Sequence, residues 1–445
     1  MQTLTKTCVV SCPISTRSGY GARSRDFVRA LIEAKPDWDI KILAQRWGQC
    51  PMDALDDEDD MDLISRIILG NLTFKPNIWI QITVPNEFQP VGDFNIGVTA
   101  GVETTIMPHH CLEGVNRMDL TLTSSEFAKG VIQNTMFDKK DSNTGQILGQ
   151  LKCEKPVEVL FEGVDLDVYD DNVEIEPRIK DVFKNIKEDF CYLFVGHWLS
   201  GEFKQDRKNV GGLIHTFLDT FKNKPNPPAL ILKTNGASTS VVDRVDIKRK
   251  IQTIKDSVKA KSLPNIYLIH STLTDWEVNS LYNHPKVKCH VSFTRGEGFG
   301  RPLLEASISG KPMIVSGWSG HMDFINEKYI STIGGSLEDV HPSAANDFLL
   351  KEAKWFTIDY AEASKVMLDV KKNYVEYLNH SKAQSKYSKQ NFSYEKMVEK
   401  LESLLGNEVV NSKPVSVGLK LPKLKKVGQP QEAPKLKLPK LKKVE

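Results

Sequence analysis

The stretch VSFTRGEGFGRPLLEASISGKPMIVSGWSGHMDFI, residues 291–325, decides how this chain folds. A β-type run ends at Phe293. Three of the five residues in Gly296–Gly300 then lack a Cβ atom, so that loop can approach a ligand closely. A proline soon afterwards suits the first turn of a helix, and Gly310 ends that helix. Residues 312–315 form a second short apolar strand. The stretch therefore predicts strand, glycine loop, helix and strand.

Two carboxylates lie within this unit, Glu297 in the loop and Glu305 in the helix, with seven residues between them. The free N–H groups at a helix N-terminus favour an anion, so a phosphate would fit at the start of this helix. The residues expected to surround that phosphate are Gly298, Phe299, Gly300 and Arg301. Each carboxylate could then accept hydrogen bonds from sugar hydroxyls on either side of the phosphate. Such an arrangement describes a nucleotide-sugar.

The segment GEGFGRPLLEA, with the continuation GKPMIV, resembles the E-x7-E signature of retaining GT-B glycosyltransferases of the family-4 type. The resemblance extends over roughly residues 7–405. It implies a nucleotide-sugar donor, taken as a UDP-sugar, with Glu297 holding the transferred sugar and Glu305 the ribose. It also implies that the acceptor hydroxyl attacks on the face from which the diphosphate leaves, with no metal or other cofactor. The alternative is an ordinary strand–loop–helix with solvated glutamates.

A second glycine loop follows the apolar run Thr7–Cys12 and precedes a helix-like stretch. By the resemblance, this loop approaches the donor diphosphate, with Gly19 and Gly21 as the close-approach positions and Arg17 as a phosphate partner. Short glycine turns also simply reverse the chain, so this alternative stays open.

The segment GVETTIMPHHCLEGVNR, residues 101–117, is where relatives of this type carry a residue that reaches the donor sugar, often a histidine. Three candidates are present: Glu103, His109 and His110. Two adjacent histidines cannot point the same way on a helix or strand. His109 is taken as the catalytic candidate, and the choice among the three stays open.

Two cations, Arg207 and Lys208, come between the buried strand at residues 190–195 and the next helix. Lys208 matches the lysine that grips the donor diphosphate in the resembling family. His197 stands where an arginine is expected, so either Arg207 supplies that charge or this lengthened loop is arranged differently. Two phosphate charges in a cleft require cations or a divalent metal. Because no D-x-D motif is directly flanked by a strand, cations and helix dipoles are expected, and no metal. The alternative is a solvated helix start.

Alternation of strands and helices along both halves predicts an α/β fold with two doubly wound, Rossmann-like domains facing a cleft. Beyond residue 325 the chain is expected to be largely helical to about residue 405. Residues 1–167 are predicted to form an N-terminal acceptor-side domain, and residues 168–385 a nucleotide-sugar domain. Residues 386–405 are predicted to form a final helix that packs back on the first domain, and residues 406–445 a disordered basic tail.

The tail repeats LKLPKLKKV at residues 419–427 and 436–444. Residues 413–445 contain ten lysines and two glutamates, a charge of +8, whereas the whole chain carries +2, which leaves −6 for the remainder. Lysine and proline at this density predict disorder, and two copies of one peptide indicate avidity for a partner. DNA, a replication protein and an anionic membrane surface are the candidates. A merely solubilising tail is the alternative.

The cysteine content, the lack of long apolar runs and the basic tail indicate where the protein is located and which acceptor it uses. Seven scattered cysteines without C-x-x-C predict neither disulfides nor a zinc site. No apolar run or leader-like start predicts membrane insertion or export, so a cytoplasmic location is expected, in a bacterial host if the chain is phage-encoded. The basic tail favours hydroxymethylated bases in DNA as the acceptor, as in bacteriophage enzymes. A glycan, lipid or protein acceptor and a non-catalytic GT-B-like scaffold are the alternatives.

Overall fold

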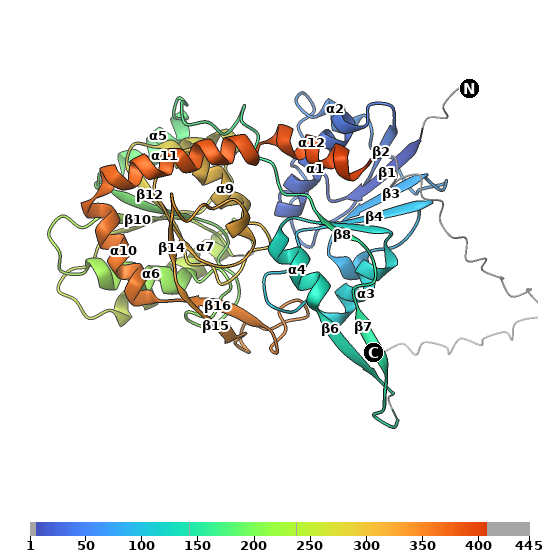
Figure 1. Cartoon of the computed structure of the whole chain (residues 1–445). Coiled ribbons are helices and arrows are strands. Elements are labelled where there is room, and N and C mark those ends of the chain that lie inside the picture. Colours follow the sequence, from blue (N-terminus) through green and yellow to red (C-terminus); the bar gives the residue numbers. More distant parts are fainter. Residues whose placement is uncertain (1–5, 142, 237, 407–445) are drawn as a thin grey trace, which may run out of the picture. The chain divides into compact units, whose positions relative to one another are not determined.

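The computed structural model describes residues 6–141, 143–236 and 238–406 (Figure 1). The first half of the chain builds a six-stranded parallel sheet in the order β2-β1-β3-β4-β5-β8. These strands are β1 (Thr7–Cys12), β2 (Asp39–Ala44), β3 (Ile78–Ile82), β4 (Phe94–Thr99), β5 (Leu120–Thr123) and β8 (Val157–Val159). Strands such as TCVVSC are apolar at consecutive positions because helices and loops cover both faces of the sheet.

The second half builds another six-stranded parallel sheet, in the order β11-β10-β9-β12-β13-β14. Its strands are β9 (Cys191–Val195), β10 (Ala229–Lys233), β11 (Ile266–Ile269), β12 (Val287–Ser292), β13 (Met313–Ser316) and β14 (Ser331–Ile333). The predicted α/β architecture with two doubly wound parallel sheets is therefore confirmed. In each sheet the strand order reverses once, between β1 and β3 and between β9 and β12.

Helices connect the strands and cover the sheets (Figure 1). Those of the first half are α1 (Gly19–Ala34), α2 (Met61–Ile64), the 3₁₀ turn η1 (Pro85–Glu87), α3 (His109–Arg117) and α4 (Glu126–Asn134). Those of the second half are α5 (Pro177–Lys184), α6 (Val210–Phe221), α7 (Val241–Ser257), α8 (Asp275–Asn283), α9 (Arg301–Ile308), the 3₁₀ turn η2 (Gly320–Asp323) and α10 (Tyr360–Lys372). Residues 291–325 thus contain the end of β12, a glycine loop, α9 and β13, in the predicted order.

The prediction that residues 326–405 are largely helical is wrong over its first part. That part contains β14 and an antiparallel pair, β15 (Gly335–Asp339) and β16 (Lys354–Ile358). The sequence of β16, KWFTI, is rich in aromatic and β-branched residues, and its Trp355 is fully buried. In contrast, β15 is exposed along its length, so only its pairing with β16 makes it a strand.

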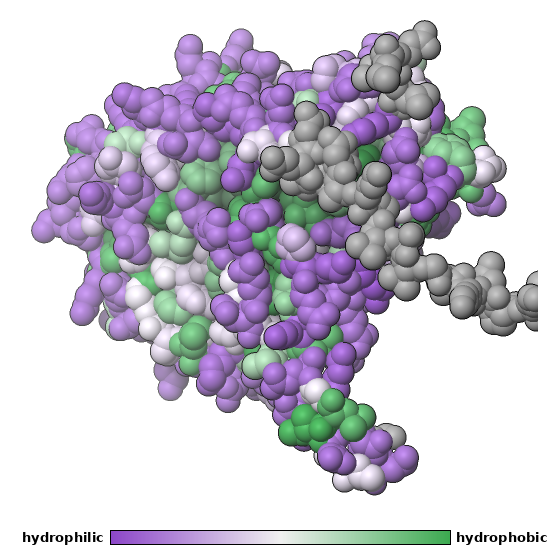
Figure 2. Space-filling model, turned by 45° about the vertical axis from the view of Figure 1, so that its right-hand side comes forward, coloured by the Kyte–Doolittle hydropathy of each residue, from purple (hydrophilic) through white to green (hydrophobic). Residues whose placement is uncertain are grey.

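A second antiparallel ribbon, β6 (Met136–Lys140) and β7 (Ile147–Lys152), is attached to the first half. Phe137 and Leu151 of this ribbon pack against α3, whereas Met136, Ile147 and Leu148 are exposed. Figure 2 shows apolar side chains gathered near the end of this ribbon.

The last two helices contact different halves of the chain. The helix α11 (Tyr374–Asn391) packs on α9, and α12 (Tyr394–Leu404) packs on α1. Met397, Leu401 and Leu405 belong to the hydrophobic core of the first sheet. The helix at the end of the described chain thus completes a core whose other members precede residue 161.

The repeated basic segment predicted to be a disordered tail lies outside the described residues, apart from Gly406. None of the helices described here combines the length and the apolar character that a bilayer crossing requires.

Candidate active site

The candidate site lies where the strand order of the second sheet reverses. The loop after β9 carries Arg207 and Lys208, and the loop after β12 carries Glu297. Adjacent parallel strands present their carboxyl ends at one edge, and ligands of open α/β sheets bind at such a reversal. The topology therefore brings together two segments that are about ninety residues apart in sequence.

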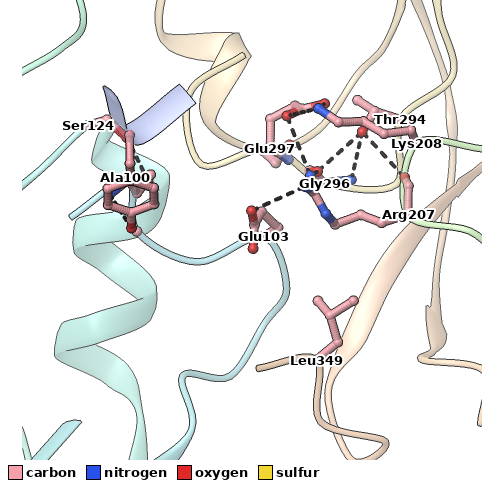
Figure 3. A network of polar contacts seen from close by, with 12 residues as sticks. Ala100, Glu103, Ser124, Arg207, Lys208, Thr294, Gly296, Glu297 and Leu349 are labelled. Atoms are coloured by element: carbon pink, nitrogen blue, oxygen red, sulfur yellow. Dashed lines mark hydrogen bonds and ion pairs between the residues drawn. The ribbon is translucent and has the colours of Figure 1, made fainter. Parts of the chain in front are cut away.

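The glycine loop before α9 is shaped by close backbone packing. Gly300 has a φ angle of +93° and caps α9. A Cβ atom on Gly296 would lie 1.9 Å from the carbonyl oxygen of Glu103, and one on Gly298 would lie 2.2 Å from that of Ala100. These glycines let the loop after β4 rest directly on the loop after β12. Figure 3 shows Glu103 of the first loop beside Gly296 of the second. The Ser125 hydroxyl, from the start of α4, also donates to the Gly298 carbonyl at 2.6 Å.

Glu297 lies at the centre of a buried ion-pair network (Figure 3). Lys208 Nζ lies 2.6 Å from both of its carboxylate oxygens, and Arg207 Nη1 lies 3.5 Å from Oε2. Burial alone would raise the pKa of Glu297, but the attraction of Lys208 and Arg207 outweighs it and lowers that pKa to about 2. Glu297 is therefore ionised at any physiological pH.

Arg207 is shared between two carboxylates and a backbone carbonyl. Its Nη2 lies 3.3 Å from Glu103 Oε1, and its Nη1 donates to the Gly296 carbonyl at 2.6 Å. Burial would lower the pKa of Arg207, but Glu103 and Glu297 together raise it. Burial lowers the pKa of Lys208, and its attraction to Glu297 only partly offsets this. Arg207 and Lys208 thus face two carboxylates, Glu103 from the first half of the chain and Glu297 from the second.

Glu305 lies in the first turns of α9 and belongs to a second ion-pair network. Arg301 Nε donates to Glu305 Oε1 at 2.8 Å, and the Tyr282 hydroxyl donates to Oε2 at 3.3 Å. Arg301 also pairs through Nη1 with Asp26 of α1. Burial raises the pKa of Glu305 to about 7, although Arg301 opposes that shift. This carboxyl can therefore gain or lose a proton near neutral pH.

Four other predicted residues are placed as follows. The exposed Arg17 is paired with Asp53, at 2.9 Å from Nε to Oδ1. A Cβ atom on Gly19 would meet open space, whereas one on Gly21 would lie 2.0 Å from the Thr16 carbonyl oxygen, so Gly21 is needed by the turn itself. Phe299 is buried in the core and packs on Phe324, with 5.1 Å between ring centroids.

Glu103, His109 and His110 make different contacts. The two histidines begin α3, where their rings contact Phe137 and Phe348 respectively. In the described part of the chain, neither histidine forms a hydrogen bond or ion pair with Glu297, Arg207 or Lys208, whereas Glu103 pairs with Arg207. The network thus contains the carboxylate of this segment and not its histidines.

Sequence reasoning missed Asp26 and Ser125 as members of the site. Asp26 pairs with a residue 275 positions away, and Ser125 bonds to a residue 173 positions away. Ser125 caps α4 by accepting from the Ala128 amide. Its additional contact with the glycine loop depends on tertiary structure, which a capping pattern does not report.

A cavity of about 360 Å³ lies elsewhere, between the loop after β9 and α7. Trp198, Phe203, Lys204 and Lys250 are among the residues that line it, and neither Glu297 nor Glu305 does. The candidate site is therefore defined by its charges and by the topology of the sheet, not by the volume of a cavity.

No protein-family model matches this chain, and no curated protein matches it by sequence. Several solved structures have a similar fold. A glycosyltransferase from Rickettsia africae aligns with a TM-score of 0.57 and 14% identity, covering 92% of this chain and 99% of that chain. Anabaena Alr3699/HepE, solved with UDP and glucose, aligns at 0.54 and 12%, covering 90% and 99%. Sucrose-phosphate synthase from Thermosynechococcus elongatus aligns at 0.58 and 10%, covering 90% and 98%.

At sequence identities this low, the alignments establish a shared fold and nothing more specific. Because they cover nearly the full length of both chains, the shared fold includes both sheets. The chain therefore has the GT-B fold of these glycosyltransferases.

Proposed function

We propose that this chain is a glycosyltransferase that moves a sugar from a nucleotide-sugar, a UDP-sugar, to an acceptor hydroxyl. The observation that carries the proposal is the buried cluster of Glu297, Lys208 and Arg207 beside the N-terminus of α9, at the strand-order reversal. A UDP-sugar is favoured because Alr3699/HepE, which shares the fold, was solved with UDP-glucose.

In the proposed complex the donor diphosphate lies against Lys208, Arg207 and the start of α9. These charges and the free N–H groups of the helix stabilise the negative charge that develops as the diphosphate leaves. Glu297, which is ionised and oriented by Lys208, accepts hydrogen bonds from the transferred sugar. Glu305, oriented by Arg301 and Tyr282, accepts hydrogen bonds from the ribose.

We propose further that the anomeric configuration is retained. The acceptor oxygen forms a bond to the anomeric carbon as the bond from that carbon to the diphosphate oxygen breaks. The acceptor proton passes to an oxygen of the leaving diphosphate. Glu297 is poorly suited to act as a base because Lys208 and Arg207 hold its pKa at about 2. Two protein cations and a helix N-terminus supply the charge that a metal would otherwise provide, so the proposed reaction is metal-independent.

The test is incubation of the full chain with a panel of nucleotide-sugars and acceptors, with products identified by mass spectrometry and the anomeric configuration by NMR. The expected result is a product of retained configuration whose yield EDTA does not change. Glu305→Ala should abolish both transfer and donor hydrolysis. If no nucleotide-sugar is bound or consumed by the unaltered chain, a non-catalytic scaffold is the correct interpretation.

For the acceptor we propose hydroxymethylated bases in DNA. Support comes from the ten lysines and two glutamates of residues 413–445, because such a segment binds phosphates electrostatically. A gel-shift comparison of the full chain with a chain ending at residue 411 tests the role of that segment. Weaker DNA binding by the shorter chain at low salt is expected. Equal binding, or transfer to a glycan instead of DNA, would contradict the proposal.

A further inference from the structure

Glu162 is a buried carboxylate to which no described residue donates a hydrogen bond. It lies just after β8, at the carboxyl edge of the first sheet, and is 9% exposed. Within the described residues, no hydrogen bond and no ion pair reaches its side chain. Arg23, the cation beside it, donates from Nη1 to the Phe161 carbonyl at 2.8 Å and from Nη2 to the Leu160 carbonyl at 2.6 Å.

The charged groups around Glu162 come from both halves of the chain. Arg23 and Asp26 lie on α1, Arg301 lies on α9, and Glu297 belongs to the glycine loop. Arg301 uses its Nη1 for Asp26 and its Nε for Glu305. Burial raises the pKa of Glu162, although Arg23 and Arg301 oppose the shift. Glu162 thus lies within electrostatic range of Arg301 and Glu297, two residues of the site to which the proposed function assigns the donor.

A buried carboxylate without a hydrogen-bond donor is costly, and native proteins rarely retain one without a reason. The missing partner can be identified from the charges nearby. A phosphate would be repelled by the carboxylate, and a cation would compete with the guanidinium groups of Arg23 and Arg301. A neutral O–H donor satisfies the carboxylate without either conflict. Sugar hydroxyls are donors of this kind.

We propose that Glu162 is a substrate-binding residue that accepts a hydrogen bond from a hydroxyl group of a bound substrate. This inference rests on the proposed glycosyl transfer. The hydroxyl comes either from the ribose of the nucleotide or from the acceptor, and both sources offer the same chemistry. The carboxylate of the ligand-free chain is left without a partner because substrate supplies it.

The experiment compares Glu162→Ala and Glu162→Gln in the full chain with the control Glu158→Gln. Glu158 lies on β8 itself, is half-exposed, and pairs with Lys129 at 2.8 Å. One arm measures UDP and 2′,3′-dideoxy-UDP binding by calorimetry. The second measures transfer from UDP-glucose to a monosaccharide panel and to an oligonucleotide containing 5-hydroxymethylcytosine. The third measures the melting temperature of each ligand-free chain.

If the ribose is the partner, Glu162→Ala weakens UDP binding by about tenfold or more but leaves dideoxy-UDP binding unchanged. If the acceptor is the partner, UDP binding is unchanged and the acceptor KM rises by about the same factor. In both cases Glu162→Gln does not lower the melting temperature of the ligand-free chain, because it removes an unpaired charge.

The proposal is overturned if UDP binding and transfer by both variants stay within twofold of the unaltered chain. It is also overturned if Glu162→Gln lowers the melting temperature while binding and transfer are unchanged, since that result marks a structural role. Failure of the proposed function is recognised separately: the unaltered chain then neither binds UDP nor forms product, and this inference falls with it.

Discussion

At the scale of single residues, Glu103 pairs with Arg207, a cation that the proposed donor diphosphate would also contact. Its Oε1 lies 3.3 Å from Arg207 Nη2, and both residues are in the network around Glu297. A carboxylate that pairs with this guanidinium competes with a phosphate for the same donors. We therefore expect Glu103→Gln to bind UDP about 2- to 5-fold more tightly by calorimetry, since a partly exposed charge pair is worth up to roughly 1 kcal/mol.

The matched control for this variant is Glu113→Gln, since Glu113 is an exposed carboxylate on α3 in the same segment. Its UDP affinity should not change. Weaker UDP binding by Glu103→Gln would show that Glu103 assists the donor and does not compete with it.

The raised pKa of Glu305 should make the free energy of unfolding depend on pH. In the folded chain its pKa is about 7, against an ordinary value of 4.5. Between these values the folded state holds a proton that the unfolded state has lost, so this group makes stability fall as pH rises from 4.5 to 7. Its contribution over that window is at most about 3 kcal/mol. Urea unfolding should show a smaller fall between pH 5 and pH 8 for Glu305→Gln than for the unaltered chain.

The exposed Glu376 at the start of α11 provides a comparison, and Glu376→Gln should keep the original pH dependence. Identical slopes for Glu305→Gln and the unaltered chain would show that Glu305 titrates normally.

At the scale of structural elements, the loop before α9 must fit against the loop after β4. A Cβ atom on Gly298 would lie 2.2 Å from the Ala100 carbonyl oxygen, so Gly298→Ala must displace one of the two loops. Displacement of about 1 Å at a catalytic site can reduce the rate by roughly 100-fold. We expect Gly298→Ala to reduce UDP-glucose turnover by at least tenfold and to lower the melting temperature.

Gly130 is the contrasting position, because it lies inside α4 and a Cβ atom there would meet nothing within 4 Å. Gly130→Ala should leave turnover unchanged and stabilise the chain by about 0.5–1 kcal/mol. Unchanged turnover in Gly298→Ala would mean that the two loops separate without consequence for the reaction.

At the scale of the whole molecule, α12 makes the stability of the first half depend on the end of the chain. Leu401 is fully buried in the core of the first sheet, against residues that precede it by more than two hundred positions. Leu401→Ala should reduce the free energy of unfolding by about 2–5 kcal/mol, measured by urea titration. The exposed neighbour Lys400 is the control, and Lys400→Ala should change the free energy of unfolding little. Equal stability of the two variants would show that α12 is not part of the cooperative core.

Local sequence determined the unit from β12 to β13, because a strand, a glycine loop, a proline and a helix are specified by neighbouring residues. The same reasoning failed for β15, whose residues are all exposed and whose conformation depends on pairing with β16. The resemblance to a known family selected Arg207 and Lys208, which the structure places on Glu297.

Only the tertiary structure decided which side chains meet across the two halves. Glu103 and not His109 contacts Arg207, and Asp26 contacts Arg301. Glu162 is buried and receives no hydrogen bond from the part of the chain that the structure describes. No periodicity or spacing reports these facts, because contacts between residues 89–275 positions apart depend on how two sheets pack and not on any local pattern. The sequence by itself determined the two parallel sheets and the glycine loop, since hydrophobic periodicity and the absence of a Cβ atom act within a few residues.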